Sequence, residues 1–566
     1  MSTPARRSSS VLLSGVASRF ALSLNPWSMA LFLIALTVAL PILVVLGHIV
    51  LPTDGIWQHL ASTVLPRYLS NTFWLVLWVG LGTLVIGTGT AWLVVMCRFP
   101  GKRIFEWALL LPLAVPTYVI AYAYTDFLQV AGPLQSMLRE WFDWRVGDYY
   151  FPNIRSLGGA ITLITFVLYP YVYLLARASF LEQSVCVLDV GRTLGRGPWH
   201  LFGTVALPLA RPALVGGVSL VLMETLNEFG AVQFFGVDTF TTGIYRTWFG
   251  LGEPVAAAQL AACLLTFVIV LVLLERWSRG KRRYFHTSSR YQQLPEYRLR
   301  GWQATGAFLA CLLPITIGFL LPSGLLLNMA IRIGDSLFGT RFIGFALNSL
   351  SLSAIAALIA VGLAVLLSYG VRLNNSPSAR LFTRIAAMGY AIPGSVVAVG
   401  ILIPFAWLDH TLNSWLHANY GKIIGLVFSG TAFILIYAYV VRFLAVSFNA
   451  VEASLGKVTP SMDAASRTLG QTAGGTLRRI HTPLMRSSLL AAGILVFVDA
   501  MKELPATIIL RPFNFDTLAV RAHNLASDER LAEASTASLT IVVVGILPVI
   551  LLSLAMRRAR PGSQAE

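Results

Sequence analysis

Apolar runs recur along the whole 566-residue chain, and each is long enough to cross a lipid bilayer as a single helix. About 20 apolar residues in a helix span a hydrocarbon core of roughly 30 Å, and a helix satisfies its own backbone hydrogen bonds there. Charged residues make up only 12% of the sequence, whereas soluble domains contain roughly 25%. The sequence therefore predicts an all-α, polytopic membrane protein.

We expect about twelve transmembrane helices, six in each half of the chain. In the first half the predicted spans are 27–51, 71–96, 107–129, 158–180, 209–233 and 255–275. In the second half they are 303–328, 346–370, 385–407, 423–446, 486–510 and 532–555. The first apolar run is too long for the core of a signal peptide, so it is interpreted as an uncleaved span.

One stretch of sequence occurs twice. Arg-Thr-Leu-Gly stands at residues 192–195 and again at 467–470, and Pro208 and Pro483 follow the two copies at the same distance. The same shift aligns Glu224 with Asp499, Glu228 with Glu503, Phe240 with Phe515, Thr242 with Thr517 and Arg246 with Arg521. Upstream, after small insertions, Asn71 aligns with Asn348, Pro116 with Pro393, Tyr171 with Tyr439 and Phe180 with Phe448. A repeat of this length indicates two tandem, parallel six-helix halves.

We divide the chain into a first repeat at 1–276, a basic cytoplasmic linker at 277–300 and a second repeat at 301–566. Most of the 42 Lys and Arg residues fall on one side of this topology, which the positive-inside rule assigns to the cytoplasm together with both termini. This topology accounts for the formal charge of +17, so nucleic-acid binding is not expected. The linker is interpreted as a topology anchor rather than a contact for anionic lipid or a partner.

No motif in the sequence indicates an enzyme. The four cysteines are single, and the eight histidines lack metal-ligand spacing. No G-x-x-x-x-G-K-[ST] phosphate loop occurs. We therefore expect no cofactor, no catalytic residue and no nucleotide site. Five tyrosines are expected to pack in the membrane and are not assigned as iron ligands: Tyr169, Tyr171, Tyr173, Tyr437 and Tyr439.

Two pairs of carboxylates end the fifth span of each half. Glu224 and Glu228 are four residues apart, as are Asp499 and Glu503, so each pair is predicted to share one helical face. A carboxylate inside a membrane helix costs about 2.5 to 3.5 kcal/mol near the centre and usually faces a polar cavity or a counter-charge. We expect these four residues to line a translocation path that favours a cation, and we assign no firm metal site.

The repeated stretch is predicted to form a helix, a turn and a second helix on the cytoplasmic side. Arg192 and Arg467 fall in the first helix, which Gly195 or Gly470 ends because glycine tolerates the left-handed conformation. The second helix is expected to break at Pro208 or Pro483 before the next span begins.

This stretch resembles the EAA loop of the membrane subunits of binding-protein-dependent ABC importers. The resemblance rests on Gly195, Val205, Leu207 and Pro208, and on Gly470, Ile480 and Pro483. It departs from the family at the front of the loop, where Asp189 replaces the glutamate in one half and Asp463 stands one position early in the other. In that family the loop docks into the cytoplasmic ATPase, so the resemblance implies one ATPase contact per half.

Within that family the chain is most similar to the fused, two-half permeases of ferric-iron uptake, on the segments Asn227 to Trp248 and Met501 to Glu533. The resemblance implies a multi-pass permease in the bacterial inner membrane, a periplasmic substrate-binding protein and two cytoplasmic ABC ATPase subunits. Fused permeases for thiamine or aminoethylphosphonate share this architecture and remain alternatives.

Three other classes fit the sequence less well. An ion-coupled secondary transporter also uses repeated six-span halves, but the duplicated cytoplasmic loop argues against it. A sensor or scaffold leaves the matched carboxylates and the two loops without a role. A membrane enzyme lacks the ligand and catalytic motifs that its chemistry requires.

Overall fold

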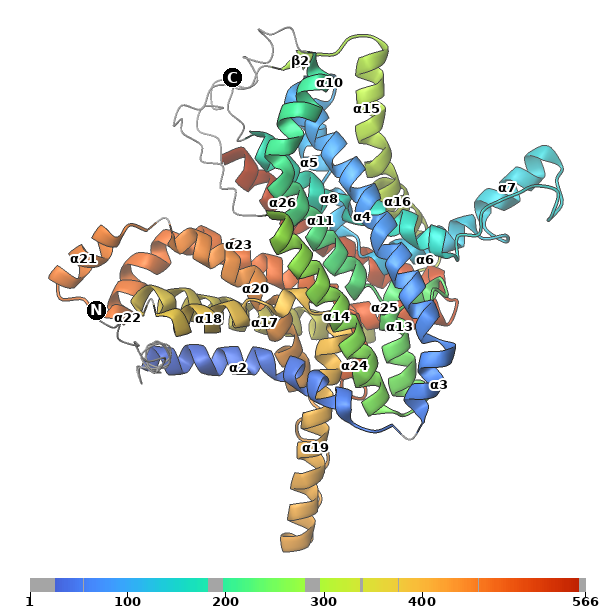
Figure 1. The fold of residues 1–566 in the computed structure, drawn as a ribbon. Coiled ribbons are helices and arrows are strands. Elements are labelled where there is room, and N and C mark those ends of the chain that lie inside the picture. The colour runs from blue at the N-terminus through green and yellow to red at the C-terminus, as the bar shows by residue number, and fades with distance from the viewer. Residues whose placement is uncertain are drawn as a thin grey trace, which may run out of the picture.

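The computed structural model of the protein describes residues 26–53, 55–181, 197–279, 296–335, 339–374, 376–456 and 458–558. Within these ranges nearly every element is a helix (Figure 1). The strands β1 (Cys97–Arg98) and β2 (Tyr297–Arg298) form one short parallel pair, which ties the described end of the linker to the first half. The predicted all-α, polytopic fold is confirmed.

The described residues contain 11 helices that are long and apolar enough to cross a membrane, or up to 12 if one bent pair counts as a span. This agrees with the predicted number. In the first half these helices are α2 (Pro26–Gly47), α4 (Leu65–Met96), α8 (Leu157–Leu181), α11 (Leu207–Asn227) and α14 (Pro254–Arg279). In the second half they are α15 (Trp302–Ile315) with α16 (Leu321–Arg332), α17 (Thr340–Leu373), α19 (Gly394–Tyr420), α20 (Ala432–Leu455), α23 (Thr482–Met501) and α26 (Leu531–Arg558).

The third span of each half is broken at a proline. The prediction of a continuous helix over 107–129 is wrong, because α5 (Lys102–Ala108), α6 (Thr117–Leu128) and α7 (Pro133–Phe142) replace it, with a 90° bend at the break. In the second half α18 (Pro377–Ala386) ends early, so the span predicted at 385–407 begins instead at Gly394. Pro116 and Pro393 precede α6 and α19, and neither has the N–H that an uninterrupted helix requires.

The fifth span of each half ends before the predicted position. Helix α11 stops at Asn227 and α12 (Gly230–Phe234) follows, while α23 stops at Met501 and α24 (Pro505–Leu510) follows. Glu228 is extended, with ψ near 127°. The expectation that each carboxylate pair shares one helical face is therefore wrong.

After α12 and α24 the two halves form equivalent contacts, but the equivalent residues are offset from those that the sequence alignment pairs. Asn71 donates to the carbonyl of Asp238 and Asn348 donates to that of Asp516. The next residues, Thr239 and Thr517, begin α13 (Phe240–Tyr245) and α25 (Leu518–Ser527). Thr517 is therefore structurally equivalent to Thr239 and not, as the alignment predicts, to Thr242.

The first helix of each half packs on the opposite half. Helix α2 lies against α17, α18 and α19 (Figure 1), and Tyr437 donates a 2.6 Å hydrogen bond to the carbonyl of Thr37. Helices α15 and α16 contact α4, α5 and α6 in the same way, and Tyr124 donates to the carbonyl of Ile317 at 2.7 Å. This exchange interlocks the halves around the surface where the carboxylates lie.

Candidate functional site

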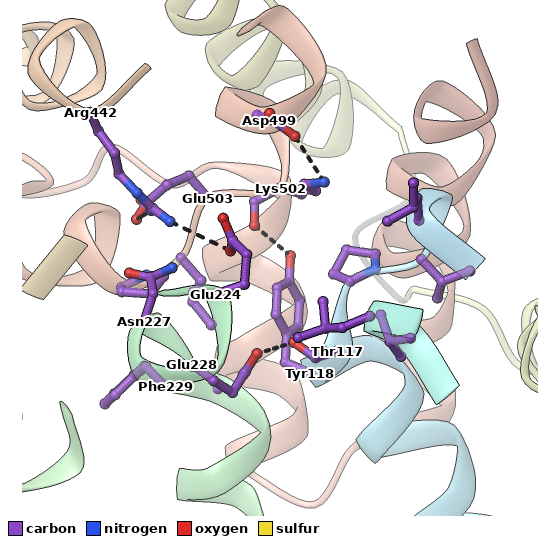
Figure 2. A pocket seen from close by; sticks show the side chains of 18 of the residues that line it. Thr117, Tyr118, Glu224, Asn227, Glu228, Phe229, Arg442, Asp499, Lys502 and Glu503 are labelled. Atoms are coloured by element: carbon purple, nitrogen blue, oxygen red, sulfur yellow. Dashed lines mark hydrogen bonds and ion pairs between the residues drawn. The ribbon is translucent and has the colours of Figure 1, made fainter. Parts of the chain in front are cut away.

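A cavity of about 90 Å³ lies where the breaks of the two halves meet (Figure 2). We call it the acidic cavity, because all four predicted carboxylates reach its wall. It is lined by Leu113, Val115, Pro116, Thr117, Tyr118, Val167, Leu168, Tyr171, Glu224, Asn227, Glu228, Phe229, Gly230, Arg442, Phe443, Asp499, Lys502, Glu503, Leu504 and Pro505. The structure thus brings together residues that are far apart in sequence.

Glu228 is held by neutral groups. Its carboxylate accepts a hydrogen bond from the hydroxyl of Thr117 and a 2.9 Å bond from the backbone N–H of Ala231, at the start of α12. A carboxylate at a helix start satisfies backbone N–H groups that have no partner within the helix, which explains the break locally. In the described part of the chain no basic side chain forms an ion pair with Glu228.

Glu503 occupies the equivalent position but carries its own cation. Arg442 of α20 donates from Nη1 to Glu503 Oε1 at 2.7 Å, and both side chains are buried. Glu503 also accepts from the N–H groups of Ala506 and Thr507 at the start of α24. Gly394 makes room for this pair, because an added Cβ there would lie 2.7 Å from Glu503 Oε1.

A second ion pair lies at one end of the acidic cavity. Lys502 Nζ is 2.9 Å from Asp499 Oδ1, so Lys502 neutralises Asp499 and not Glu503. Glu224 is 4.0 Å from Arg442 Nη2, at the limit of an ion pair (Figure 2). With four carboxylates and two basic side chains, the wall carries an excess of negative charge.

Sequence reasoning missed Arg442 and Asn227 as parts of this site. Arg442 is a lone basic residue within an apolar span, which is a signal for a buried partner. Asn227 accepts a 2.7 Å hydrogen bond from the N–H of Gly394 and so joins the two halves beside the cavity. Nothing in its own sequence context marks it, because the contact exists only after the halves assemble.

Metal-ligand geometry is not apparent in the part of the chain that the structure describes. Its residues include no group of three or more His, Cys, Asp or Glu side chains placed to hold a metal ion. Three of the five tyrosines bond to protein groups: Tyr173 donates to the carbonyl of Glu106, Tyr437 to that of Thr37, and Tyr439 bonds with Thr507. Tyr171 lines the acidic cavity.

The structure describes the full repeated loop only in the second half of the chain. Helix α21 (Pro460–Thr468) contains Arg467 and is followed by Gly470, whose φ of +73° is left-handed. Helix α22 (Ala473–Thr476) comes next, so the predicted helix, glycine turn and helix are present. We call residues 460–476 the knob. The matching residues Asp189, Arg192 and Gly195 lie outside the described residues.

The expected breaks at Pro208 and Pro483 do not occur. A π-helical turn precedes each proline, at Phe202–Ala206 and Leu477–His481, and the helix continues through it. The N–H of the residue just before each proline bonds to the carbonyl five residues back, so the helical hydrogen-bond pattern shifts by one residue where proline has no N–H to donate. Ile480 lies in the second π turn and Leu207 just after the first. The helix is therefore continuous from Ala473 in the knob to Met501 at the end of α23.

Asp463 is engaged within the chain. It accepts a 2.8 Å hydrogen bond from Arg372 Nε of α17 and lies 2.7 Å from His481 Nε2. Burial acts to raise the pKa of Asp463, but the hydrogen bonds from Arg372 and His481 hold this pKa below its ordinary value. Arg467 and Leu469, by contrast, are exposed at the tip of the knob.

Comparison with known proteins agrees with this architecture. Residues 83–284 match the family described as "Binding-protein-dependent transport system inner membrane component". The Fe(3+)-transport system permease protein FbpB 2 of Haemophilus influenzae is 27% identical over 536 residues, covering 93% of this chain and 97% of that protein. The molybdenum transport system permease protein ModB of Escherichia coli is 28% identical over 231 residues, which cover 40% of this chain and 94% of ModB.

Proposed function

We propose that this chain is a fused, two-half membrane permease of a binding-protein-dependent ABC importer and that its cargo is ferric iron. The relative that covers both halves is named for Fe(3+) transport. A relative that covers 37% of this chain is named as a putative 2-aminoethylphosphonate permease. The acidic cavity supports iron over these anions, because an excess of carboxylates attracts a cation and repels a molybdate or phosphonate anion.

The observation that carries the proposal is the imbalance of charge in the acidic cavity. Arg442 neutralises Glu503 and Lys502 neutralises Asp499, which leaves Glu228 without a basic partner among the described residues. Carboxylate oxygens are hard ligands and suit a hard cation. Glu228 and Glu224 are therefore the residues that would contact iron in passage.

Energy for transport comes from outside this chain. We propose that two cytoplasmic ABC ATPase subunits bind the two repeated loops, one at the knob and one at Asp189, Arg192 and Gly195. Exposed Arg467 and Leu469 at the knob tip support this contact. A periplasmic substrate-binding protein would deliver iron to the opposite face of the inner membrane, and both termini would then be cytoplasmic.

The test is ATP hydrolysis and uptake in proteoliposomes that contain this chain and its cognate ATPase. External binding protein is added loaded with ferric ion, thiamine or aminoethylphosphonate. We expect only the ferric-loaded protein to stimulate hydrolysis, and Glu228→Gln to slow iron uptake about tenfold, equivalent to about 1.4 kcal/mol. Glu452→Gln, at an exposed carboxylate of α20, is the matched control.

Two results would contradict the proposal. Stimulation by another loaded cargo would keep the importer and reject iron. Full iron uptake by Glu228→Gln would place the acidic cavity outside the path.

A further inference from the structure

A second, larger cavity of about 700 Å³ lies beside the acidic cavity and between the same two halves. We call it the vestibule. It is lined by Leu113, Tyr171, Leu174, Leu220, Met223, Val272, Glu275, Ala387, Met388, Tyr390, Ala391, Ala445, Val446, Asn449, Leu495, Val498, Asp499, Lys502, Gly545, Pro548 and Val549. Most of these side chains are apolar, in contrast to the acidic cavity.

The vestibule lies on the knob side of the acidic cavity. On α20 the lining passes from Arg442 in the acidic cavity to Asn449 in the vestibule, towards the end that leads into the knob. On α23 it passes from Lys502 to Leu495, again towards the knob. The vestibule also reaches Glu275, the last residue of the span that begins at Pro254.

The boundary between the two cavities consists of the residues that line both. These are Leu113, Tyr171, Asp499 and Lys502, which we call the septum. The ion pair between Lys502 and Asp499 spans 2.9 Å within it. The hydroxyl of Tyr118 lies 3.5 Å from the carbonyl of Lys502 and fixes the backbone from the side of α6. The septum thus places one ion pair between the acidic cavity and the mostly apolar vestibule.

We propose that the septum is the gate on the knob side, with the Lys502–Asp499 pair as its latch; this inference rests on the proposed import function. A cation leaving the acidic cavity towards the knob must pass the septum, where the carboxylate of Asp499 is already paired with Lys502 and does not attract it. Lys502 aligns with Asn227 in the first half, so the first half has no basic side chain at this position. The latch is a feature of the second half alone.

The fold also links this gate to the ATPase side. Asp499 and Lys502 lie at the end of a rod that runs from Ala473 in the knob to Met501 without a break. The other wall of the septum, Leu113 and Tyr171, belongs to the first half. Movement of the knob therefore shifts the latch against a wall that belongs to the other half, which opens the septum.

The test uses two cysteine probes on one helix. Leu168 lines the acidic cavity and Leu174 the vestibule, and Tyr171 of the septum lies between them on α8. Each probe is introduced into a full-length chain whose four native cysteines are replaced by serine, and a membrane-impermeant methanethiosulfonate is applied from the knob side of membrane vesicles. We expect Leu174→Cys to react and Leu168→Cys to react at least about tenfold more slowly.

Opening the latch should remove this difference. Lys502→Met is expected to speed the reaction of Leu168→Cys about tenfold while leaving Leu174→Cys unchanged, which also shows that the fold is intact. Tyr171→Ala, which thins the septum and keeps both Lys502 and Asp499 in the chain, should give the same result. Lys422→Met, at an exposed lysine outside the cavities, is the control.

Equal reactivity of the two probes in the unaltered septum would overturn the proposal. So would protection of Leu168→Cys that persists in both Lys502→Met and Tyr171→Ala. The labelling needs neither cargo nor ATPase, so a cargo other than iron would leave these results unchanged.

Discussion

Arg442 and Glu503 form a 2.7 Å ion pair that is buried where the two halves of the protein meet. The alignment of Tyr171 with Tyr439 and of Phe180 with Phe448 places Leu174 opposite Arg442 in the first half. The first half therefore lacks this cation, and Glu228 is bound by the hydroxyl of Thr117 instead. The carboxylate of the second half has a buried basic partner, whereas the carboxylate of the first half is bonded by neutral groups.

Arg442→Leu should destabilise the protein strongly. The change leaves Glu503 charged and buried without a cation, which typically costs about 3 to 5 kcal/mol. Thermal unfolding in detergent should show a much lower melting temperature for Arg442→Leu. Combining Arg442→Leu with Glu503→Gln should restore most of the melting temperature. Arg67→Leu breaks an exposed pair with Asp238 and should cost less than about 1 kcal/mol. Equal losses in Arg442→Leu and Arg67→Leu would show that the buried pair contributes no more than a surface one.

The sequence predicts the spans well because apolar length alone decides whether a segment can cross a membrane. It does not predict where they break. Pro116 and Pro393 sit in apolar runs that hydropathy counts as continuous, and Glu228 ends a helix by bonding to amides further along the chain. The four carboxylates were identified from the repeat, but Arg442 was not, because it has no counterpart in the first half.

Gly470→Val should weaken the coupling between the ATPase and the permease, and it should do so only through a change in backbone conformation. An L-residue with a left-handed φ costs about 1 to 2 kcal/mol, and an added Cβ at Gly470 would meet nothing within 4 Å. We expect ATPase stimulation to fall about tenfold in Gly470→Val, and to be retained in Gly470→Asn, since asparagine tolerates this conformation. Gly474→Ala, in α22 and equally uncrowded, is the control. Loss of stimulation in Gly470→Asn as well would mean that the side chain, not the backbone, disturbs the contact.

Asp409→Ala should loosen the segment that returns from α19 to α20. Asp409 is fully buried and accepts hydrogen bonds from the N–H groups of Val427, Phe428 and Ser429. Each backbone donor left without a partner costs about 1 to 3 kcal/mol, so hydrogen exchange over 421–431 should accelerate at least tenfold, or about 1.4 kcal/mol. Asp528→Ala, at an exposed carboxylate, should leave exchange there unchanged. Unaltered exchange in Asp409→Ala would show that α19 and α20 hold the segment without it.

The contact that fixes the knob should depend on pH in one direction. The pKa of Asp463 is lowered in the folded protein by Arg372 and His481, despite the opposing effect of burial. A lowered pKa stabilises the fold above the unfolded value of about 3.9, and this stability is lost as the pH falls below it through the folded pKa. Asp463→Asn should therefore cost about 1.5 to 3 kcal/mol at pH 7, the range for hydrogen bonds to charged groups.

The same comparison in acid separates this charge effect from simple packing. As the pH falls below the unfolded value of about 3.9 and through the lowered pKa of Asp463, the wild-type carboxyl accepts a proton, so the melting temperatures of the wild type and Asp463→Asn should converge. Asp528→Asn should match the wild type at both pH values, because Asp528 is exposed. If the gap caused by Asp463→Asn were the same at pH 7 and in acid, the shape of the side chain and not its charge would hold the knob to α17.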